Sequence, residues 1–192
     1  MKLLKSKNLF FKELEVSDVS QRYVDWLNDP EINKFLMVGS SKQNISSFEM
    51  KEEAIVENKP NIDSCKEYVK KLKQSKNDFL FGIFENKENI HIGNIKLTIS
   101  HPREKIAELG ILIGEKRFQG KGYGIESIDT ITQFALNELN LIRIQAGFHD
   151  INQKSLHCFL KCGYSQDGHL KSYWIIDNKR VGRILASIIK NG

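Results

Sequence analysis

The sequence predicts an α/β domain in which helices flank a mixed, mostly antiparallel sheet of about seven strands. Short apolar runs bounded by turn residues alternate with segments whose apolar residues recur every three or four positions. The clearest example is residues 111–127, where a strand pattern leads into a glycine-rich turn and then an amphipathic helix. A chain of 192 residues with 40% hydrophobic content fits one domain, 1–192, and no change in composition marks a second.

Seven segments have the apolar and β-branched content of strands. In chain order they are Leu9–Leu14, Leu80–Phe84, Ile92–Leu97, Ala107–Ile113, Leu141–Phe148, Tyr164–Ile176 and Lys179–Ile189. Helices are predicted where apolar residues follow the helical period or where capping residues occur. They run from the expected cap Ser17 to Asn28, from Pro30 to about Leu36, along the apolar stripe Ile125–Leu139, and from Asn152 to Lys161. Gly163 follows the last helix and suits the left-handed residue that ends it.

The turn Gln119–Gly124 has the composition of a phosphate-binding loop. Its glycines let the backbone approach a ligand, and the free N–H groups of the following helix carry the positive end of the helix dipole. Lys121 adds a positive charge. Two known motifs fail, because a dinucleotide fingerprint would need glycine at Ile125 and a P-loop counted from Gly114 would need glycine at Gln119. A phosphate-bearing cofactor of another kind is predicted, with an ordinary strand–helix turn as the alternative.

The pattern that remains is Gln or Arg, two residues, Gly, one residue, and Gly or Ala, and it is met by Gln119, Gly122 and Gly124. It resembles the pyrophosphate loop with which the GCN5-related N-acetyltransferase (GNAT) superfamily binds acetyl-coenzyme A (acetyl-CoA). Residues 146–164 resemble the second CoA-contacting region of this superfamily. The resemblance implies a three-layer GNAT fold and an acyltransferase that moves an acetyl group from acetyl-CoA to an amine.

The resemblance also implies which residues contact the cofactor. In the superfamily the strand before the loop separates from its neighbour, and its free backbone groups bind the pantetheine arm and polarise the thioester. The residues expected to contact acetyl-CoA are Ile111, Leu112, Ile113, Phe118, Gln119, Gly120, Lys121, Gly122, Tyr123, Gly124, Asn152, Ser155, Phe159 and Lys161.

Acetylation of an amine needs a base for the amine proton and benefits from a proton donor for the leaving thiolate. Glu108 lies on the strand before the loop and is the first candidate for the base, with His149 and Asp150 as rivals and a solvent-facing salt bridge as the alternative for Glu108. Many superfamily members have a tyrosine where this chain has Phe159, which cannot donate a proton. Ser155 is therefore the expected acid, and a serine that only caps its own helix is the alternative.

Residues 23–36 resemble the opening of the branch that contains ribosomal-protein N-terminal acetyltransferases and, more closely, acetyltransferases of amino-sugar and surface-polysaccharide pathways. There the first two helices line the acceptor pocket, so Trp26 and Asn28 are candidate substrate-binding residues, with helix packing and a helix-ending turn as the alternatives. The resemblance favours an amino sugar, including a nucleotide-linked one, as a small-molecule acceptor. Acetylation of a protein N-terminus and a CoA-binding regulatory module without catalysis are the other interpretations.

The segment 39–63 is rich in Ser, Asn and Lys and contains Pro60. Compared with the superfamily it resembles an insertion of roughly 20 residues between the first two helices, and loops of that length often act as lids. Within it, Phe48–Glu57 has the pattern of a short helix.

The formal charge of +5 is modest and the lysines are spread along the chain, so nothing points to nucleic acid. No apolar run approaches the roughly 20 residues that span a membrane, and the N-terminus lacks a signal core. Cys65, Cys158 and Cys162 are odd in number. Cys158 and Cys162 lie one turn apart on a predicted helix beside core residues, which favours buried thiols over a disulfide or a metal site. We expect a cytoplasmic monomer or homodimer that binds neither metal, membrane nor nucleic acid.

Overall fold

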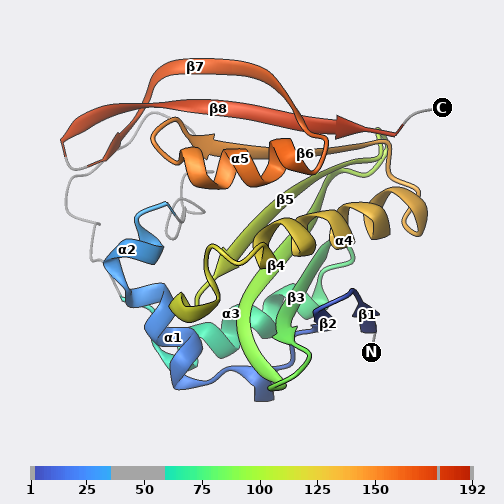
Figure 1. The fold of residues 1–192 in the computed structure, drawn as a ribbon, viewed down its shortest axis with the longest axis vertical. Coiled ribbons are helices and arrows are strands. Elements are labelled where there is room, and N and C mark those ends of the chain that lie inside the picture. Colours follow the sequence, from blue (N-terminus) through green and yellow to red (C-terminus); the bar gives the residue numbers. More distant parts are fainter. Residues whose placement is uncertain (1–2, 36–58, 177, 191–192) are drawn as a thin grey trace.

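The computed structural model describes residues 3–35, 59–176 and 178–190, which form one twisted eight-stranded sheet with helices on both faces (Figure 1). The strands are β1 (Leu3–Lys5), β2 (Leu9–Glu13), β3 (Asp78–Glu85), β4 (Ile90–His101), β5 (Ile106–Ile113), β6 (Arg143–His149), β7 (Ser165–Ile176) and β8 (Lys179–Ile189). Their order across the sheet is β1-β2-β3-β4-β5-β6-β8-β7. Among the described strands only β5 and β6 pair in parallel, so the predicted α/β class and mostly antiparallel sheet are confirmed.

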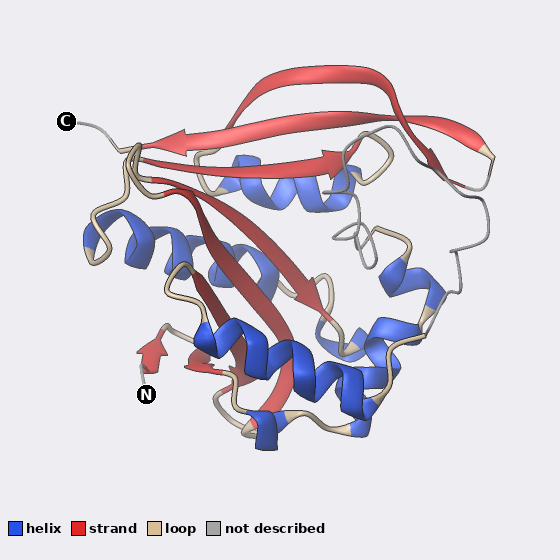
Figure 2. Cartoon of the chain, turned by 180° about the vertical axis from the view of Figure 1, so that it is seen from behind, coloured by secondary structure: helices blue, strands red, loops and turns tan. Residues whose placement is uncertain are grey.

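The helices lie on the two faces of this sheet. They are α1 (Gln21–Asn28), α2 (Pro30–Asn33), α3 (Ile62–Gln74), α4 (Tyr123–Asn137) and α5 (Gln153–Lys161), with short 3-10 turns at η1 (Val16–Asp18) and η4 (Lys116–Phe118). In Figure 1, α4 lies in front of the strands. In Figure 2, which shows the molecule from the opposite side, α3 lies in front of them. No helix of the described residues is long and apolar enough to cross a membrane.

The local signals in the C-terminal half are reproduced closely. The apolar stripe predicted along Ile125–Leu139 is buried on α4 at Ile128, Ile131 and Ala135. The last strand has the predicted bounds, and Gly163 has a φ of 87°, the left-handed conformation expected after α5.

The structure departs from the prediction in the N-terminal half. β1 adds an eighth strand to the seven expected, and its three residues are too few to produce a pattern. Ser17, the expected cap, lies inside η1, whereas α1 begins after Ser20, whose side-chain oxygen accepts a hydrogen bond from the N–H of Tyr23 at 3.4 Å. α3 is missing from the prediction, although its N-cap Asn61 exchanges hydrogen bonds with Ser64 in a capping box.

The insertion predicted over 39–63 falls mostly outside the described residues. Residues 39–58, including the helix predicted at Phe48–Glu57, are not described. Ile62 and Asp63, at the end of the segment, belong to the first turn of α3.

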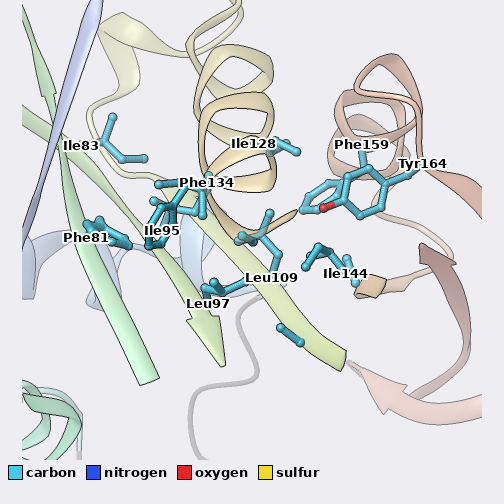
Figure 3. Close-up of a cluster of buried hydrophobic side chains, with 14 of the residues drawn as sticks. Phe81, Ile83, Ile95, Leu97, Leu109, Ile128, Phe134, Ile144, Phe159 and Tyr164 are labelled. Atoms are coloured by element: carbon cyan, nitrogen blue, oxygen red, sulfur yellow. The ribbon is translucent and has the colours of Figure 1, made fainter. Parts of the chain in front are cut away.

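Each face of the sheet has its own apolar core. The larger core joins the strands to α4 and α5, and Figure 3 shows Phe134 and Ile128 of α4 above Ile95, Leu109 and Ile144 of the sheet. The second core packs Trp26 of α1 and Val69 of α3 against the opposite face at Leu80. Burial of each large side chain contributes about 1.5–3 kcal/mol, so the two cores fix the helices on opposite sides of the strands.

Candidate active site

β5 and β6 separate halfway along their length (Figure 1). They pair at Ile106–Arg143, Ala107–Ile144 and Glu108–Gln145, and they form no further pair although β5 runs on to Ile113 and β6 to His149. β5 stays paired with β4 throughout, so in the separated part its backbone groups on the β6 side have no strand partner. Such groups need another hydrogen-bond partner, and the gap is therefore suited to an extended polar ligand.

The loop between β5 and α4 presents free N–H groups beside this gap. Gly120 and Gly122 have φ of 72° and 86°, a conformation that favours glycine, and Gly122 is the N-cap of α4 without a side-chain cap. A Cβ at either glycine would have no heavy atom within 4 Å, so the space in front of both is open. No described residue accepts a hydrogen bond from the N–H of Gly120, Lys121 or Gly122. With the positive end of the helix dipole, these groups fit an anion such as the pyrophosphate of acetyl-CoA.

The loop is held on the end of β5, and a cavity extends from it towards α5. The Nε2 of Gln119 donates to the carbonyl of Ile113 at 2.7 Å, and the Nζ of Lys121 lies 5.6 Å from the ring centre of Phe118. A cavity of about 560 Å³ is lined by Gly122, Ile125, Glu126, Asp129, Lys161 and Cys162. Because it adjoins both the N-cap of α4 and a lysine, it can take the nucleotide end of the cofactor.

The first turn of α5 carries Asn152 and Ser155, and the rest of that helix belongs to the core. The Oδ1 of Asn152 caps the helix by accepting from the N–H of Ser155 at 3.4 Å, while the half-buried Ser155 hydroxyl has no partner among the described residues. Phe159 is only 1% exposed, and its ring centre lies 5.0 Å from those of Phe148 and Tyr164. The structure thus leaves the Ser155 hydroxyl available to a ligand and places Phe159 in the packed interior.

Glu108 lies on the face of the sheet opposite α4 and α5, at the point where β5 and β6 part. Its side chain is exposed, and its Oε1 accepts a hydrogen bond from the Nε2 of Gln145 at 3.1 Å. The carboxylate therefore lies at the closed end of the gap, with one oxygen already engaged.

His149 lies on the same face at the far end of β6. It is 9% exposed, and its ring packs edge-on against Trp174 with 4.4 Å between the ring centres. Its Nδ1 has no hydrogen-bond partner among the described residues. Burial lowers the pKa of His149 below its ordinary 6.5, although the negative charge of Asp150 acts in the opposite direction. The imidazole is consequently neutral at neutral pH, the form that can accept a proton.

Four unpartnered polar atoms lie on this face of the sheet. Among the described residues, the buried side-chain nitrogen and oxygen atoms without a hydrogen bond are Asn94 Nδ2, His149 Nδ1, Arg183 Nε and Ser187 Oγ. The registers of β4, β5, β6 and β8 place all of them on the face opposite α4 and α5. Since buried polar groups in native proteins nearly always have a partner, this face offers hydrogen bonds that the protein does not use itself.

Trp26 and Asn28, the predicted acceptor contacts, hold α1 in place. The indole of Trp26 is 5% exposed and lies against Gly114 so closely that a Cβ there would have no room. The Nδ2 of Asn28 donates to the carbonyls of Val24 at 3.1 Å and Pro60 at 2.8 Å. Both side chains thus have the packing and helix-ending roles named as alternatives, and a contact with the acceptor stays a prediction.

Arg183 and Trp174 are residues of this face that the sequence analysis does not single out. Arg183 is paired with His149 across β6 and β8, and Trp174 reaches both side chains from β7. One arginine and one tryptophan in long strands carry no motif. Only the register of distant strands brings them to the site.

The chain matches the family model described as acetyltransferase (GNAT) domain over residues 8–165. It belongs to the GNAT family. It is 26% identical over 168 residues to the probable N-acetyltransferase YjcK of Bacillus subtilis. The aligned region covers 86% of this chain and 85% of YjcK. It is 27% identical over 112 residues, 57% of each chain, to the [Ribosomal protein uS5]-alanine N-acetyltransferase of Escherichia coli.

The fold agrees with solved GNAT structures. The spermidine N-acetyltransferase of Vibrio cholerae in complex with CoA and spermine superposes with a TM-score of 0.76 and 20% sequence identity over 96% of both chains. The predicted superfamily, acetyl-CoA as cofactor and an acyltransferase activity are thereby confirmed. The names of these relatives mention a ribosomal protein and a polyamine as acceptors, and none of them mentions an amino sugar.

Replacing Gly122 with valine is expected to weaken CoA binding about tenfold or more, measured by titration calorimetry. A β-branched residue is strained at a φ of 86°, and its side chain would fill the space in front of the free N–H groups. Gly168→Val in β7 is the matched control, because a Cβ there also meets nothing within 4 Å and its φ is not positive. Equal affinity of the two variants for CoA would contradict the role assigned to the loop.

Proposed function

We propose that this GNAT enzyme acetylates the primary amine of an amino sugar, nucleotide-linked sugars included. The observation that carries the proposal is the set of unpartnered polar atoms on the face opposite α4 and α5. The Nε of Arg183 and the Nδ2 of Asn94 are donors and need acceptor atoms. Sugar hydroxyls supply acceptors, whereas the ammonium groups of a protonated polyamine supply none.

A protein N-terminus is the second candidate acceptor. It is favoured by the similarity to the E. coli enzyme named for the alanine of a ribosomal protein. Peptide carbonyls could also accept hydrogen bonds from the unpartnered donors. Comparing kcat/KM for amino sugars and for peptides with a free N-terminus distinguishes a small-molecule acceptor from a protein acceptor.

The chain's backbone would hold the cofactor. When bound, acetyl-CoA supplies an acetyl group activated as a thioester. The N–H groups of Gly120, Lys121 and Gly122 would bind its pyrophosphate, with Lys161 at the nucleotide end. The backbone groups of β5 over residues 111–113 that have no strand partner would align the pantetheine arm, and an N–H group among them would donate to the thioester carbonyl, as preorganised donors do in acyl transfer.

His149 is the base that the structure favours. Its Nδ1 is buried without a partner, and the lowered pKa keeps the imidazole neutral and able to take the amine proton. Glu108 is the rival, since it lies on the same face, but it is exposed to water and bonded to Gln145. The amine nitrogen then forms a bond to the acetyl carbon as the carbon–sulfur bond breaks.

Ser155 would give its hydroxyl proton to the departing sulfur and would regain a proton from water, while the proton taken by His149 would pass to solvent. Its hydroxyl has no partner among the described residues, so it is not used up in capping α5, a task performed by the Oδ1 of Asn152. The nearby Phe159 has no proton to give and is buried in the core. Ser155 is therefore the first-turn side chain of α5 best suited to this step.

We place the enzyme in the cytoplasm. Cys65, Cys158 and Cys162 are free thiols in the structure. Burial raises the pKa of each, that of Cys162 to about 11, so they stay protonated and unreactive at neutral pH. Thiols without disulfides fit a reducing compartment.

Release of CoA thiol from acetyl-CoA across a panel of amines tests the proposed function. The panel comprises nucleotide-linked and free amino sugars, peptides with an N-terminal alanine, polyamines and aminoglycosides. We expect kcat/KM for an amino sugar to exceed that of every other class by about tenfold or more. A preference for peptides would select the second candidate, and a preference for spermidine would reject the argument from unpartnered donors.

Ser155→Ala is expected to lower kcat by about 10- to 100-fold, because the thiolate would leave without a proton donor. The Kd for CoA, measured by calorimetry, should change less than twofold, so the binding free energy should change by less than about RT ln 2. Ser155→Thr keeps the hydroxyl and should recover much of the turnover. Equal losses in turnover and CoA affinity would show that Ser155 only shapes the site.

The dependence of kcat/KM on pH separates His149 from Glu108. Because the pKa of His149 is lowered below 6.5, its imidazole is a free base above that pH, and activity should fall only at more acidic pH. His149→Gln should lower kcat/KM by about 100-fold and abolish this acidic limb, and Glu108→Gln should keep it. A limb retained in His149→Gln and lost in Glu108→Gln would assign the base to Glu108.

A further inference from the structure

We infer that Arg183 binds an anionic group of the acceptor, so that the natural acceptor is an amine that also carries a phosphate or a carboxylate. This rests on the proposed acetylation of a small amine and narrows its class. Arg183 is a specificity-determining residue in this assignment, and it takes no part in moving the acetyl group.

The guanidinium of Arg183 lies at the edge of the gap between β5 and β6. β8 pairs with β6 so that Leu185 is opposite Gly147 and Arg183 opposite His149. A Cβ on Gly147 would be 3.1 Å from both Nε and Nη2 of Arg183, so the guanidinium covers this glycine directly. Gly147 comes after Gln145, the last residue of β6 that pairs with β5, which places the positive charge over the open part of the gap.

Two aromatic rings hold the guanidinium in position. Its central carbon is 5.5 Å from the ring centres of both Tyr173 and Trp174. Neighbouring residues of a regular strand point to opposite faces, but the register of β7 shifts between Leu170 and Trp174, and Ser172 has a φ of 54°. This bulge brings both rings to one arginine, and bulges of this kind are frequent beside active sites, where they redirect side chains.

The positive charge has no counter-ion within the described chain. No carboxylate of the described residues forms an ion pair with Arg183, and its buried Nε has no hydrogen-bond partner. Asp150, next to His149, pairs instead with His169 at 3.1 Å. A half-buried guanidinium without a counter-ion is unfavourable, and its planar fork matches the oxygens of phosphate or carboxylate. In this assignment a ligand supplies the anion that no described residue provides.

That ligand is the acceptor. The phosphates of acetyl-CoA have their own site at the N-terminus of α4, on the other face of the sheet. The acceptor must reach the gap from the face on which Arg183 and His149 lie. A polyamine would bring further positive charge towards the guanidinium, whereas an anionic amine would be attracted to it.

Amines that differ only in their anionic group test this inference. The probes are D-glucosamine, its 1-phosphate and 6-phosphate esters, and the corresponding amino sugar with a carboxylate at carbon 6. Wild-type enzyme should favour at least one anionic probe over D-glucosamine by about 10- to 100-fold in kcat/KM, as expected for charge-assisted hydrogen bonds. The esters and the carboxylate distinguish a phosphate from a carboxylate ligand.

Arg183→Gln should reduce this preference to near unity, and Arg183→Lys should keep part of it, because lysine retains the charge but loses the fork. Arg180→Gln is the matched control: Arg180 lies three residues earlier in β8, its side chain is exposed, and its Nη1 donates to the carbonyl of Ser172 at 3.5 Å. Its preference should equal that of wild type. A wild-type preference for uncharged D-glucosamine, or an unchanged ratio in Arg183→Gln, would overturn the inference.

Binding measurements keep this inference separate from the proposed function. Turnover with no amine would reject the proposed function only. Calorimetry of inorganic phosphate with the CoA-loaded enzyme would then decide, since wild type and Arg180→Gln should bind it and Arg183→Gln should bind it about tenfold more weakly. Equal phosphate affinity in all three proteins, or weaker CoA binding by Arg183→Gln alone, would show that Arg183 does not serve the acceptor.

Discussion

The parallel pairing of β5 with β6 ends after Glu108–Gln145, while each strand keeps its antiparallel partner on the other side. The site depends on this arrangement. A strand that lost both neighbours would leave two rows of polar groups unpaired, but here only the edges that face the gap are open. Leu109 and Ile144 pack into the core beneath α4 near the point of separation, so the sheet stays continuous at one end and open at the other.

The separation also gives the two faces of the sheet different chemistry. On the side of α4 and α5, the groups offered to a ligand are largely backbone: the loop at Gly120 and Gly122 and the uncapped first turn of α4. On the opposite side they are side chains, of which His149 and Arg183 are held by the aromatic residues of β7. The position of backbone groups depends on chain conformation more than on residue identity. The same loop conformation is therefore compatible with different side chains on the acceptor face.

This division explains what the sequence could predict. The glycine-rich turn, apolar alternation and the stripe on α4 are local signals, and from them the sequence predicts the loop before α4 and most of the strands. β1 has only three residues, too few for an alternating pattern, and the polar capping box of α3 gives no apolar signal, so neither element is predicted from the sequence. The pairing of His149 with Arg183 depends on the register of strands that are distant in sequence, for which a single sequence has no signal. Phe159 and Trp26 both lie in core clusters, and their predicted contacts with the cofactor and the acceptor stay predictions.

Two properties of the side chains on the acceptor face bear on the proposed acceptor: which of them donate hydrogen bonds, and what charge they carry. The unpartnered Nε of Arg183 and Nδ2 of Asn94 can only donate, and the guanidinium adds a positive charge that no described carboxylate pairs with. A solved spermidine N-acetyltransferase in complex with CoA and spermine shares the fold at 20% identity, and a likeness at this level concerns the fold alone. The net charge of +5 acts in the same direction, since it attracts anionic ligands to the molecule before any contact is made. Both the local and the long-range electrostatics therefore agree with the proposed acceptor, which carries an anion next to its amine, better than with a polycation.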